Sequence, residues 1–439
     1  MLCGELAWVE PGTALRALAG HGPLVFLDSA AKGDPRAGAS YIAIQPRAVL
    51  RLGSASALAP WLEAARPEDA SCPPDWPFPF KGGAMGWLGY EAGMAPLEVR
   101  TRHAPIPGLP AGWFGMFDLV LGFDHAARRC FALAANRPEA EAAARIAALT
   151  ARLALPIPDW APLPRLDWRA ELPRASYEAR VERLRAYIAA GDVYQANFTA
   201  RFLAPRPAAF SPAACHAALR ARSPAPFAAF IDTGEGVALC SASPERFLSL
   251  SAAGQVEARP IKGTAPRHAD PAQDAANIAA LRENQKERAE NLMITDLLRN
   301  DLGQVCAIGS VRVPELFTVE SFAQAHHLVS AVTGRLRGGV NAASLLLAAF
   351  PGGSITGAPK RRAMQIIDEL EEGARGAYCG AIAWIGLDGA MDSSIIIRTL
   401  VATPDTLYAQ AGGGITWDSD PAAEYEEMML KLSPLIAHG

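Results

Sequence analysis

The sequence predicts an α+β fold in which most of the sheet is antiparallel. Strand-like segments follow one another in groups, and long helical patterns separate the groups instead of alternating with single strands. Half of the 439 residues are hydrophobic and a fifth are charged, which is enough apolar sequence for a large buried core. No short-period repeat is visible, so a solenoid or a propeller is not expected.

The chain divides into three regions by composition. Residues 1–154 mix short apolar runs with glycine-rich turns and end in an alanine-rich helical stretch, Pro138 to Ala154. Residues 155–174 contain five prolines, which exclude a continuous helix or a central strand and indicate a linker or a surface crossover. Residues 175–436 carry the strongest motifs, so we expect this region to form the catalytic domain.

The third region opens with a helical pattern followed by a strand pattern. Ser176 is a suitable N-cap, Gly191 is a suitable stop, and apolar residues recur between them at helical spacing. "DVYQANFTARF", Asp192 to Phe202, then alternates as a strand does. Further strands are expected at residues 227–232, 236–241, 245–250, 255–261, 308–313, 378–387, 391–402 and 406–411. Further helices are expected at residues 272–300, 341–349, 359–371 and 421–436.

Charge and cysteine content bound the class of protein. The chain has 41 basic and 45 acidic residues, so the balance gives no indication of binding to nucleic acid or to an anionic membrane. No apolar run is long enough to span a bilayer, and the first residues lack a secretory signal pattern. The seven cysteines are scattered without a C-x-x-C pair, which favours reduced thiols and a cytoplasmic location.

Lysine is rare in this chain, and its positions are informative. Only six of the 41 basic residues are lysines, at positions 32, 81, 262, 286, 360 and 431, so arginine supplies the ordinary surface charge. A remaining lysine is expected where the wide, permanently charged fork of arginine would not serve, although chance could also place it there. Lys262 is the clearest case, because "PIKGTAPR" puts it beside Ile261 at the end of an apolar strand.

Two carboxylates are candidates for a metal site. On a helix, Glu290 shares one face with Ile294 and Asp301, so it lies on a core-facing stripe and needs a cation or a hydrogen-bonding partner. Glu427 lies on the last helix, four residues before Lys431. The simple interpretation is that each acid pairs with a neighbouring basic residue. The functional interpretation is that Glu290 and Glu427 together hold Mg²⁺, which completes its shell with water and substrate oxygens.

Two glycine-rich segments and one arginine indicate an anionic ligand. Gly412 to Gly414 allow backbone amides to approach a ligand closely, and "FPGGSITGAPK" opens a helix where a carboxylate could be held. The second segment fails the P-loop pattern. Arg398 falls inside an apolar strand run, where it requires either a bidentate anion or a structural ion pair. Together with the two acids, these features suggest a dicarboxylate substrate with one carboxylate on magnesium.

Six motifs resemble those of the chorismate-utilising enzymes, in the order and spacing of that family. They are "PIKGTAPR", "AENLMITDLLRNDLG", "HHLVS", "FPGGSITGAPK", "MDSSIIIRTL" and "AGGGITWDSDPAAEYEEMMLK". Within the family they are most similar to the component I subunits that form aminodeoxychorismate for para-aminobenzoate and folate synthesis. The resemblance implies two large antiparallel sheets packed orthogonally with outer helices. It also implies ammonia addition to chorismate, a magnesium cofactor and a glutamine amidotransferase partner that supplies the ammonia.

The resemblance also implies a role for individual residues. Lys262 and His327 match the catalytic positions, with Lys262 as the nucleophile and His327 near the departing hydroxyl. Glu290 and Glu427 match the metal ligands. The positions implied for substrate binding are Gln195, Ser354, Gly357, Arg398, Gly412, Gly413, Gly414 and Lys431.

Two of these positions discriminate between branches of the family. Anthranilate synthases typically have alanine where this chain has Lys262, and the water-adding isochorismate and salicylate synthases have a lysine base where this chain has Gln195. Anthranilate synthesis therefore stays an alternative, as does a non-catalytic protein that binds small anions or an amidotransferase. The chain lacks the G-x-C-x-G motif of an amidotransferase, so that partner is expected to be separate. Trp384 replaces a tyrosine common in the family and is expected to add bulk to the substrate pocket.

Overall fold

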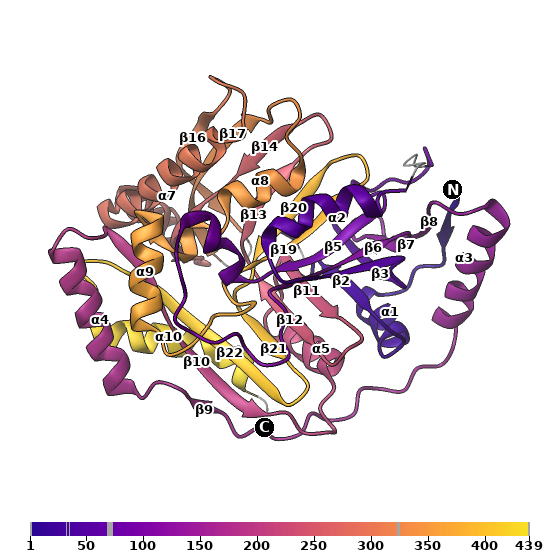
Figure 1. Cartoon of the computed structure of the whole chain (residues 1–439), viewed down its shortest axis with the longest axis horizontal. Coiled ribbons are helices and arrows are strands. Elements are labelled where there is room, and N and C mark those ends of the chain that lie inside the picture. The colour runs from indigo at the N-terminus through magenta and orange to yellow at the C-terminus, as the bar shows by residue number, and fades with distance from the viewer. Residues whose placement is uncertain (1, 32, 35, 68–72, 323–324, 438–439) are drawn as a thin grey trace.

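Two large antiparallel sheets organise the chain (Figure 1). The computed structural model describes residues 2–31, 33–34, 36–67, 73–322 and 325–437. Within these residues, the first sheet has twelve strands. In spatial order they are β1 (Leu2–Leu6), β8 (Arg129–Ala134), β7 (Leu119–Asp124), β3 (Ala39–Ile44), β2 (Leu24–Asp28), β11 (Phe227–Asp232), β12 (Ala238–Ser243), β21 (Thr399–Ala402), β22 (Thr406–Ile415), β10 (Gln195–Pro205) and β18 (Gly357–Ala358), with β9 (Arg169–Ala170) paired to β10.

The second sheet has ten strands among the same residues. In spatial order they are β15 (Ile261–Pro266), β17 (Ala325–Arg335), β14 (Gln255–Ala258), β13 (Arg246–Leu250), β20 (Met391–Ile395), β19 (Ala381–Gly386), β5 (Gly83–Leu88), β6 (Gly112–Phe117) and β4 (Ala48–Leu52), with β16 (Arg312–Ser321) paired to β17. The prediction of an α+β fold with two large antiparallel sheets is confirmed.

Both sheets combine strands from the two ends of the sequence. β2 of the N-terminal region pairs with β11, and β5 pairs with β19. The division into residues 1–154, 155–174 and 175–436 therefore describes composition, while the sheets cross that division. Residues 155–168 form neither helix nor strand, which agrees with the crossover expected from their prolines.

The helices mostly follow their apolar periodicity. They are α1 (Pro11–Leu18), α2 (Leu58–Ala65), α3 (Glu139–Leu153), α4 (Arg174–Ala189), α5 (Pro212–Arg222), α6 (Pro271–Glu283), α7 (Gln285–Gly303), α8 (Ala342–Ala349), α9 (Lys360–Leu370) and α10 (Pro421–Ile436), with short 3-10 turns η1 (Ala55–Ala57), η2 (Tyr90–Gly93), η3 (Ala95–Leu97) and η4 (Gly353–Ile355). The prediction that Ser176 caps α4 is wrong, because the helix starts two residues earlier with Pro173 as N-cap.

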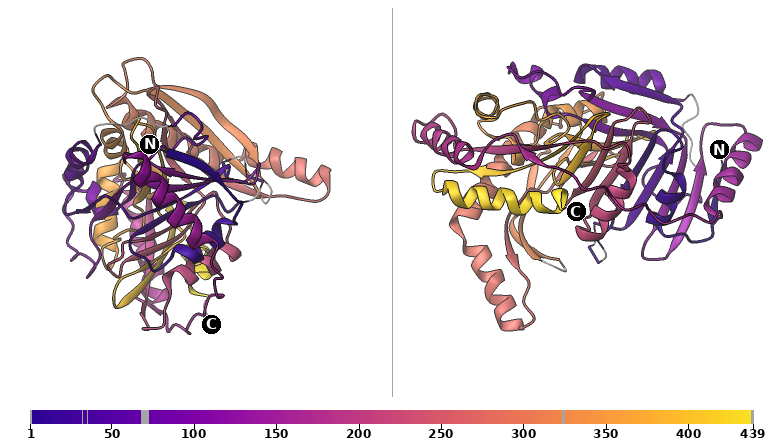
Figure 2. Two further views of the ribbon diagram at one scale, coloured as in Figure 1. Left: turned by 90° about the vertical axis from the view of Figure 1, so that its right-hand side faces the viewer. Right: turned by 90° about the horizontal axis from the view of Figure 1, so that it is seen from below.

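The single helix expected over 272–300 is two helices. Asn284 has an extended backbone and its side chain accepts a hydrogen bond from the Glu287 N–H, so it ends α6 and caps α7. Figure 2 shows the segment around α6 extending away from both sheets. Leu281 is the one residue of α6 that is buried. This break separates the start of α7, which carries Glu290, from the projecting arm.

The strand expected over 391–402 is also two strands, and they belong to different sheets. β20 pairs with β13 and β19 in the second sheet, whereas β21 pairs with β12 and β22 in the first. The chain crosses between the sheets at residues 396–398, where Arg398 has a φ of 51°. Arg398 therefore does not lie inside a strand, and the sequence-based placement is wrong at this point.

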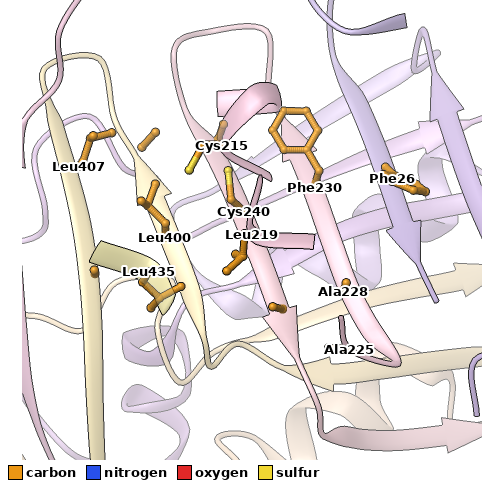
Figure 3. Close-up of a cluster of buried hydrophobic side chains, with 14 of the residues drawn as sticks. Phe26, Cys215, Leu219, Ala225, Ala228, Phe230, Cys240, Leu400, Leu407 and Leu435 are labelled. Carbon is orange, nitrogen blue, oxygen red and sulfur yellow. The ribbon is translucent and has the colours of Figure 1, made fainter. Parts of the chain in front are cut away.

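The core lies between the two sheets and on the outer face of each, where helices cover it. Figure 3 shows one cluster of buried side chains in which Leu219 of α5 and Leu435 of α10 pack with Phe230, Cys240 and Leu400 of the strands. The expected helical stripe of α4 is buried at Tyr177, Val181 and Leu184. Among the described helices, none combines the length and the apolar composition that crossing a membrane requires.

A buried ion pair joins α9 to the end of α7. The Lys360 ammonium donates hydrogen bonds to Asp301 Oδ2 at 2.7 Å and to the Ala349 carbonyl at 2.9 Å. Each of the two charged side chains is only 7% exposed. Burial raises the pKa of Asp301, and the positive charge of Lys360 opposes that rise. Lys360 of the "GAPK" motif therefore has a structural role, because its ion pair with Asp301 connects α9 to α7.

Lys360→Met should lower the free energy of unfolding by about 3 kcal/mol, because it leaves the buried Asp301 carboxylate without a partner. Urea unfolding followed by circular dichroism measures the change. Lys81→Met is the control, since the Lys81–Asp388 pair spans 3.4 Å and is partly exposed, and it should cost less than about 1 kcal/mol. Equal losses in the two variants would contradict the importance of the buried pair.

Candidate active site

Lys262 lies at a β-bulge. Ile261 pairs with Val329 and Thr264 pairs with His327, so β15 has one residue more than β17 across this interval. Gly263 supplies the left-handed backbone that the bulge needs, with a φ of 84°. The bulge turns the half-buried Lys262 away from the regular alternation of the strand. A bulge re-aims a side chain in this way near many active sites.

Glu245 is the acid that accompanies Lys262. It lies between β12 and β13, and burial raises its pKa, while the positive charge of Lys262 and a hydrogen bond from Ser354 act in the opposite direction. The Ser354 hydroxyl donates to Glu245 Oε1 at 2.8 Å. The backbone carbonyl of Glu245 accepts from the Ile395 N–H at 3.1 Å, next to the crossing between the sheets. Ser354, on η4, is thereby connected to Lys262 through one carboxylate.

Glu290 of α7 is close to Lys262 on another side. Burial raises the pKa of Glu290, with opposition from Lys262 and a further rise from repulsion by Glu424 of α10. No described residue donates a hydrogen bond to the Glu290 carboxylate or forms an ion pair with it. The ordinary alternative, an ion pair of Glu290 with Lys286 or Arg299, is therefore not formed, although Lys286 contributes at longer range.

α10 places three charged groups against the glycine-rich end of β22. Lys431 donates to Glu427 Oε1 at 2.5 Å and to the Gly412 carbonyl at 3.0 Å. Burial raises the pKa of Glu424, a hydrogen bond from Ser419 lowers it, and repulsion from Glu427 adds to the rise. Glu424 therefore interacts electrostatically with both expected metal ligands, Glu290 and Glu427.

The carboxylates satisfy the requirements of magnesium better than those of a metal bound by protein alone. Among the described residues, no three His, Cys, Asp or Glu side chains converge as a metal cage. Magnesium typically takes one or two carboxylates and keeps water or substrate oxygens for its other positions. Glu290, with a carboxylate that has no hydrogen-bonding partner among the described residues, and the exposed Glu427 fit that pattern.

The three glycines of β22 have two different tasks. Asn197 and Thr199 of β10 direct their N–H groups to Thr356 and Glu371, away from β22. By the alternation of an antiparallel ladder, Gly413 is then hydrogen-bonded to Phe198, whereas Gly412 and Gly414 face the opposite edge. Because β21 follows β22 only as far as Ala409, that edge has no strand beside the two glycines. The predicted backbone cradle is thus open at Gly412 and Gly414.

Gln195 closes the other side of this cradle. Its side chain is 2% exposed, and its Oε1 atom has no hydrogen-bonding partner. A Cβ atom at Gly414 would lie 2.0 Å from Gln195 Nε2, so glycine is needed for the amide to occupy this place. Gly357, with a φ of 145°, would similarly place a Cβ atom 2.2 Å from the Gln195 carbonyl. Gln195 therefore contacts Gly414 through its side chain and Gly357 through its backbone carbonyl.

Arg398 occupies the crossing between the two sheets with an unused guanidinium. Among the described residues, none accepts a hydrogen bond from its side chain, and Glu427 is the carboxylate that acts on it electrostatically. Burial lowers the pKa of Arg398 from its ordinary value, and Glu427 opposes that shift. The structural ion pair considered as an alternative is therefore not formed, and the side chain is available to an anion.

His327 lies on β17 beside the bulge. Its Nδ1 atom is 3.0 Å from the Thr264 hydroxyl, two residues from Lys262. Burial lowers the pKa of His327, and the positive charge of Arg36 adds to the effect. Phe322 packs against the ring at 5.4 Å. Both effects disfavour the charged form of this ring.

Trp384 lies in a different cavity from the one expected. It packs against Phe80 with ring centroids 5.5 Å apart, and it lines a cavity of about 430 Å³ with Ser29, Phe227 and Asp392. None of the expected site residues lines that cavity. The effect of Trp384 on the substrate pocket therefore stays a prediction, and β19 brings this residue near the N-terminal residues Ser29 and Phe80.

Sequence reasoning missed two acids of the site. Glu245 stands in a short turn, "SPERF", and only the fold brings it to Lys262. Glu424 could have been found, because it shares a helix face with Glu427 and Lys431 at spacings of three and four. Glu245 is linked to Lys262 and Ser354, and Glu424 to Glu290 and Glu427, so both acids extend the charged set predicted from the sequence.

The chain belongs to the chorismate binding enzyme family, and its match to that family covers residues 22–437. The family resemblance inferred from the motifs is confirmed. Over 362 residues, the chain is 47% identical to aminodeoxychorismate synthase component 1 of Klebsiella aerogenes, covering 82% of this chain and 77% of that one. Over 375 residues, it is 42% identical to anthranilate synthase component 1 of Streptomyces coelicolor, covering 82% and 73%.

The fold is also that of a solved relative. Anthranilate synthase component I from Streptococcus pneumoniae superposes with a TM-score of 0.80 at 29% identity, covering 92% of this chain and 93% of that one. Relatives named as aminodeoxychorismate synthases and relatives named as anthranilate synthases both resemble this chain over most of its length. Overall similarity therefore leaves the choice between the two activities to individual residues of the site.

Proposed function

We propose that this chain replaces the C4 hydroxyl of chorismate with ammonia, giving 4-amino-4-deoxychorismate for para-aminobenzoate and folate synthesis. The observation that carries the proposal is Lys262, half-buried at a bulge between two acids, Glu245 and Glu290. The names of relatives such as the Klebsiella aerogenes component 1 support the same activity. Anthranilate synthases typically have alanine at this position, so Lys262 argues against the alternative.

The reaction is proposed to proceed through a covalent intermediate. The Lys262 amine attacks the ring carbon beside the carboxylate-bearing carbon, both conjugated ring double bonds shift by one position, and the bond from C4 to its hydroxyl breaks. Ammonia then forms a bond to C4, both double bonds shift back, and the bond from the ring to the Lys262 amine breaks. Atoms balance, because one ammonia enters and one water leaves, and lysine is regenerated.

The acids and the histidine are assigned to the proton transfers of this reaction. Glu245 accepts the proton that the Lys262 amine must lose. Burial raises the pKa of the Glu245 carboxyl, which makes its carboxylate a stronger base. His327 is assigned to the departing hydroxyl, which must be protonated to leave as water. Gln195 cannot remove a proton from water, which favours ammonia over water as the incoming nucleophile.

The substrate carboxylates are assigned to the anion-binding groups. Arg398 and the N–H groups of Gly412 and Gly414 are proposed to bind one carboxylate, with Ser354 and Gly357 on the facing turn. Glu290 and Glu427 would hold Mg²⁺, with Glu424 beside them and Lys431 orienting Glu427. When bound, magnesium neutralises the second substrate carboxylate and orients it.

A separate subunit is proposed to supply the ammonia. The component 1 designation of the relatives implies a partner, and we infer that the partner is a glutamine amidotransferase. A cytoplasmic location is proposed for the chain, because none of its described cysteines forms a disulfide.

Lys262→Ala should change the product and not only the rate. Without the amine, the ring carbon beside the carboxylate-bearing carbon is open to ammonia, so some product should shift toward aminodeoxyisochorismate or anthranilate. Lys262→Arg should be inactive, because guanidinium keeps its charge and is wider. Mass spectrometry of products formed with ammonium salts measures both effects, and the peptide containing Lys262 is searched for a substrate adduct in ammonia-free buffer.

The matched control is Lys81→Ala, which removes another lysine outside the site and should leave the product unchanged. If Lys262→Ala forms aminodeoxychorismate at the parent rate and no adduct is trapped, the covalent role is refuted.

Glu290→Gln should abolish magnesium-dependent turnover while leaving the metal-free protein at least as stable. The raised pKa of Glu290 means that its ionised form is less stable in the folded chain than in the unfolded chain. This cost is absent at low pH and appears as the pH rises through the folded pKa, so at about pH 7 the neutral amide removes it. Turnover with and without chelator, and urea unfolding in chelator, are the two measurements. Turnover of the variant in excess chelator would exclude the metal assignment.

The purified chain should use ammonium ions but not glutamine. Glutamine-dependent product should appear only when an amidotransferase subunit is added, because the catalytic groups described above provide no thiol nucleophile in the site. Glutaminase assays of the chain alone and of the mixture test this expectation. Release of glutamate by the chain alone would overturn it.

A further inference from the structure

Arg375 is a buried cation that the proposed mechanism does not use. It follows α9, and its side chain is 1% exposed. Its Nε and Nη2 atoms donate to the two oxygens of Glu371 at 2.9 and 2.6 Å, so the pair is bidentate. Tyr90 stacks on the guanidinium at 4.5 Å. A charge held this tightly, away from water, indicates a specific task for its remaining donors.

The remaining donors connect the two walls of the candidate active site. Nη1 donates to the Ile355 carbonyl at 2.9 Å, next to Ser354 on η4. Nη2 donates to the Asn197 carbonyl at 2.6 Å, two residues after Gln195 on β10. One planar group thus fixes the spacing between the turn that carries Ser354 and the strand end that carries Gln195.

The carboxylate partner strengthens the same connection. Glu371 Oε1 accepts hydrogen bonds from the N–H group of Thr199 at 3.1 Å and from its hydroxyl at 2.7 Å. Asn197 also donates its N–H to the Thr356 carbonyl at 2.8 Å, so η4 and β10 are in direct contact here. Arg375 and Glu371 together hold β10 at Asn197 and Thr199, on the side facing away from β22.

Lysine could not replace Arg375 in this arrangement. Its ammonium is a compact point charge, whereas the four bonds of Arg375 run in the directions of a planar fork toward three separate acceptor groups. A lysine would keep the charge opposite Glu371 but lose the simultaneous contact with both walls. The spacing between Ser354 and Gln195 would then be free to change.

We propose that Arg375 is a positioning residue that holds the Ser354 turn and the Gln195 end of β10 at the separation needed to bind substrate. The inference rests on the proposed amination of chorismate, and Arg375 itself does not touch the substrate. Lys262 and His327 lie on β15 and β17 of the other sheet and share no hydrogen bond with Arg375. Loss of the fork should therefore weaken substrate binding more than it slows the chemical steps.

The test is steady-state kinetics of Arg375→Lys with chorismate, magnesium and ammonium salts. The KM for chorismate should rise about tenfold while kcat changes by less than about threefold. Glu371→Gln is the second variant, and it should raise KM in the same direction but less, because the neutral amide still accepts one bond of the fork. It keeps the inference testable if Arg375→Lys does not fold.

Arg201→Lys is the matched control. Arg201 lies farther along β10 and also forms a bidentate pair, with Glu171 at 2.9 and 2.7 Å, and donates to the Ala374 carbonyl at 2.9 Å, but it contacts neither η4 nor the Gln195 end of β10. Thermal unfolding should show losses of stability in both Lys variants, while the KM of Arg201→Lys should stay near the parent value.

The outcomes separate the inference from the proposed function. If the parent enzyme is active and folded Arg375→Lys has an unchanged KM, or if Arg201→Lys raises KM equally, Arg375 is a structural residue and the inference is wrong. If the parent chain does not convert chorismate at all, the proposed function fails, and the positioning role falls with it.

Discussion

The pairing of β10 with β22 is the interaction on which the candidate active site depends. Ten residue pairs run without interruption from Ala196–Ile415 to Pro205–Thr406. This ladder brings Gln195 against Gly414, and it provides the surface on which α10 packs. The helix then directs Glu424, Glu427 and Lys431 to the glycine end of β22. A shift of the ladder by one residue would turn the side chains of the shifted strand to the other face and separate Gln195 from Gly414.

A second constraint is the balance of charge where the two sheets approach each other. Burial raises the pKa values of Glu245, Glu290 and Glu424, so the ionised form of each carboxylate is destabilised in the ligand-free chain. Lys262 opposes the rise for the first two. Such a site gains stability from an added cation, and the free guanidinium of Arg398 gains from an added anion. Binding a metal ion together with a dicarboxylate would satisfy both needs.

The choice between related activities depends on very few atoms. The chain resembles relatives named for aminodeoxychorismate synthesis and for anthranilate synthesis at similar identity, and it shares the fold of a solved anthranilate synthase component. Proteins named for either activity therefore share this scaffold, and individual side chains on it determine the specificity. Here the bulge in β15 gives one lysine a direction that no regular strand would allow.

The sequence by itself determined the class of fold, the helices with strong apolar periodicity and most of the candidate site. α3 and α10 follow from local patterns, because a helix buries a stripe whose spacing is set by the chain itself. The rarity of lysine pointed to Lys262 before any neighbour was known.

Only the tertiary structure decided which distant segments meet. The segment 391–402 reads as one strand, yet it divides between two sheets, because pairing partners far along the chain decide where a strand ends. The same cause explains why Glu245 reaches Lys262 and why Trp384 faces another cavity. Local sequence specifies the periodicity of a segment, whereas long-range pairing specifies its neighbours, and a site built from nine segments of the chain depends on those neighbours.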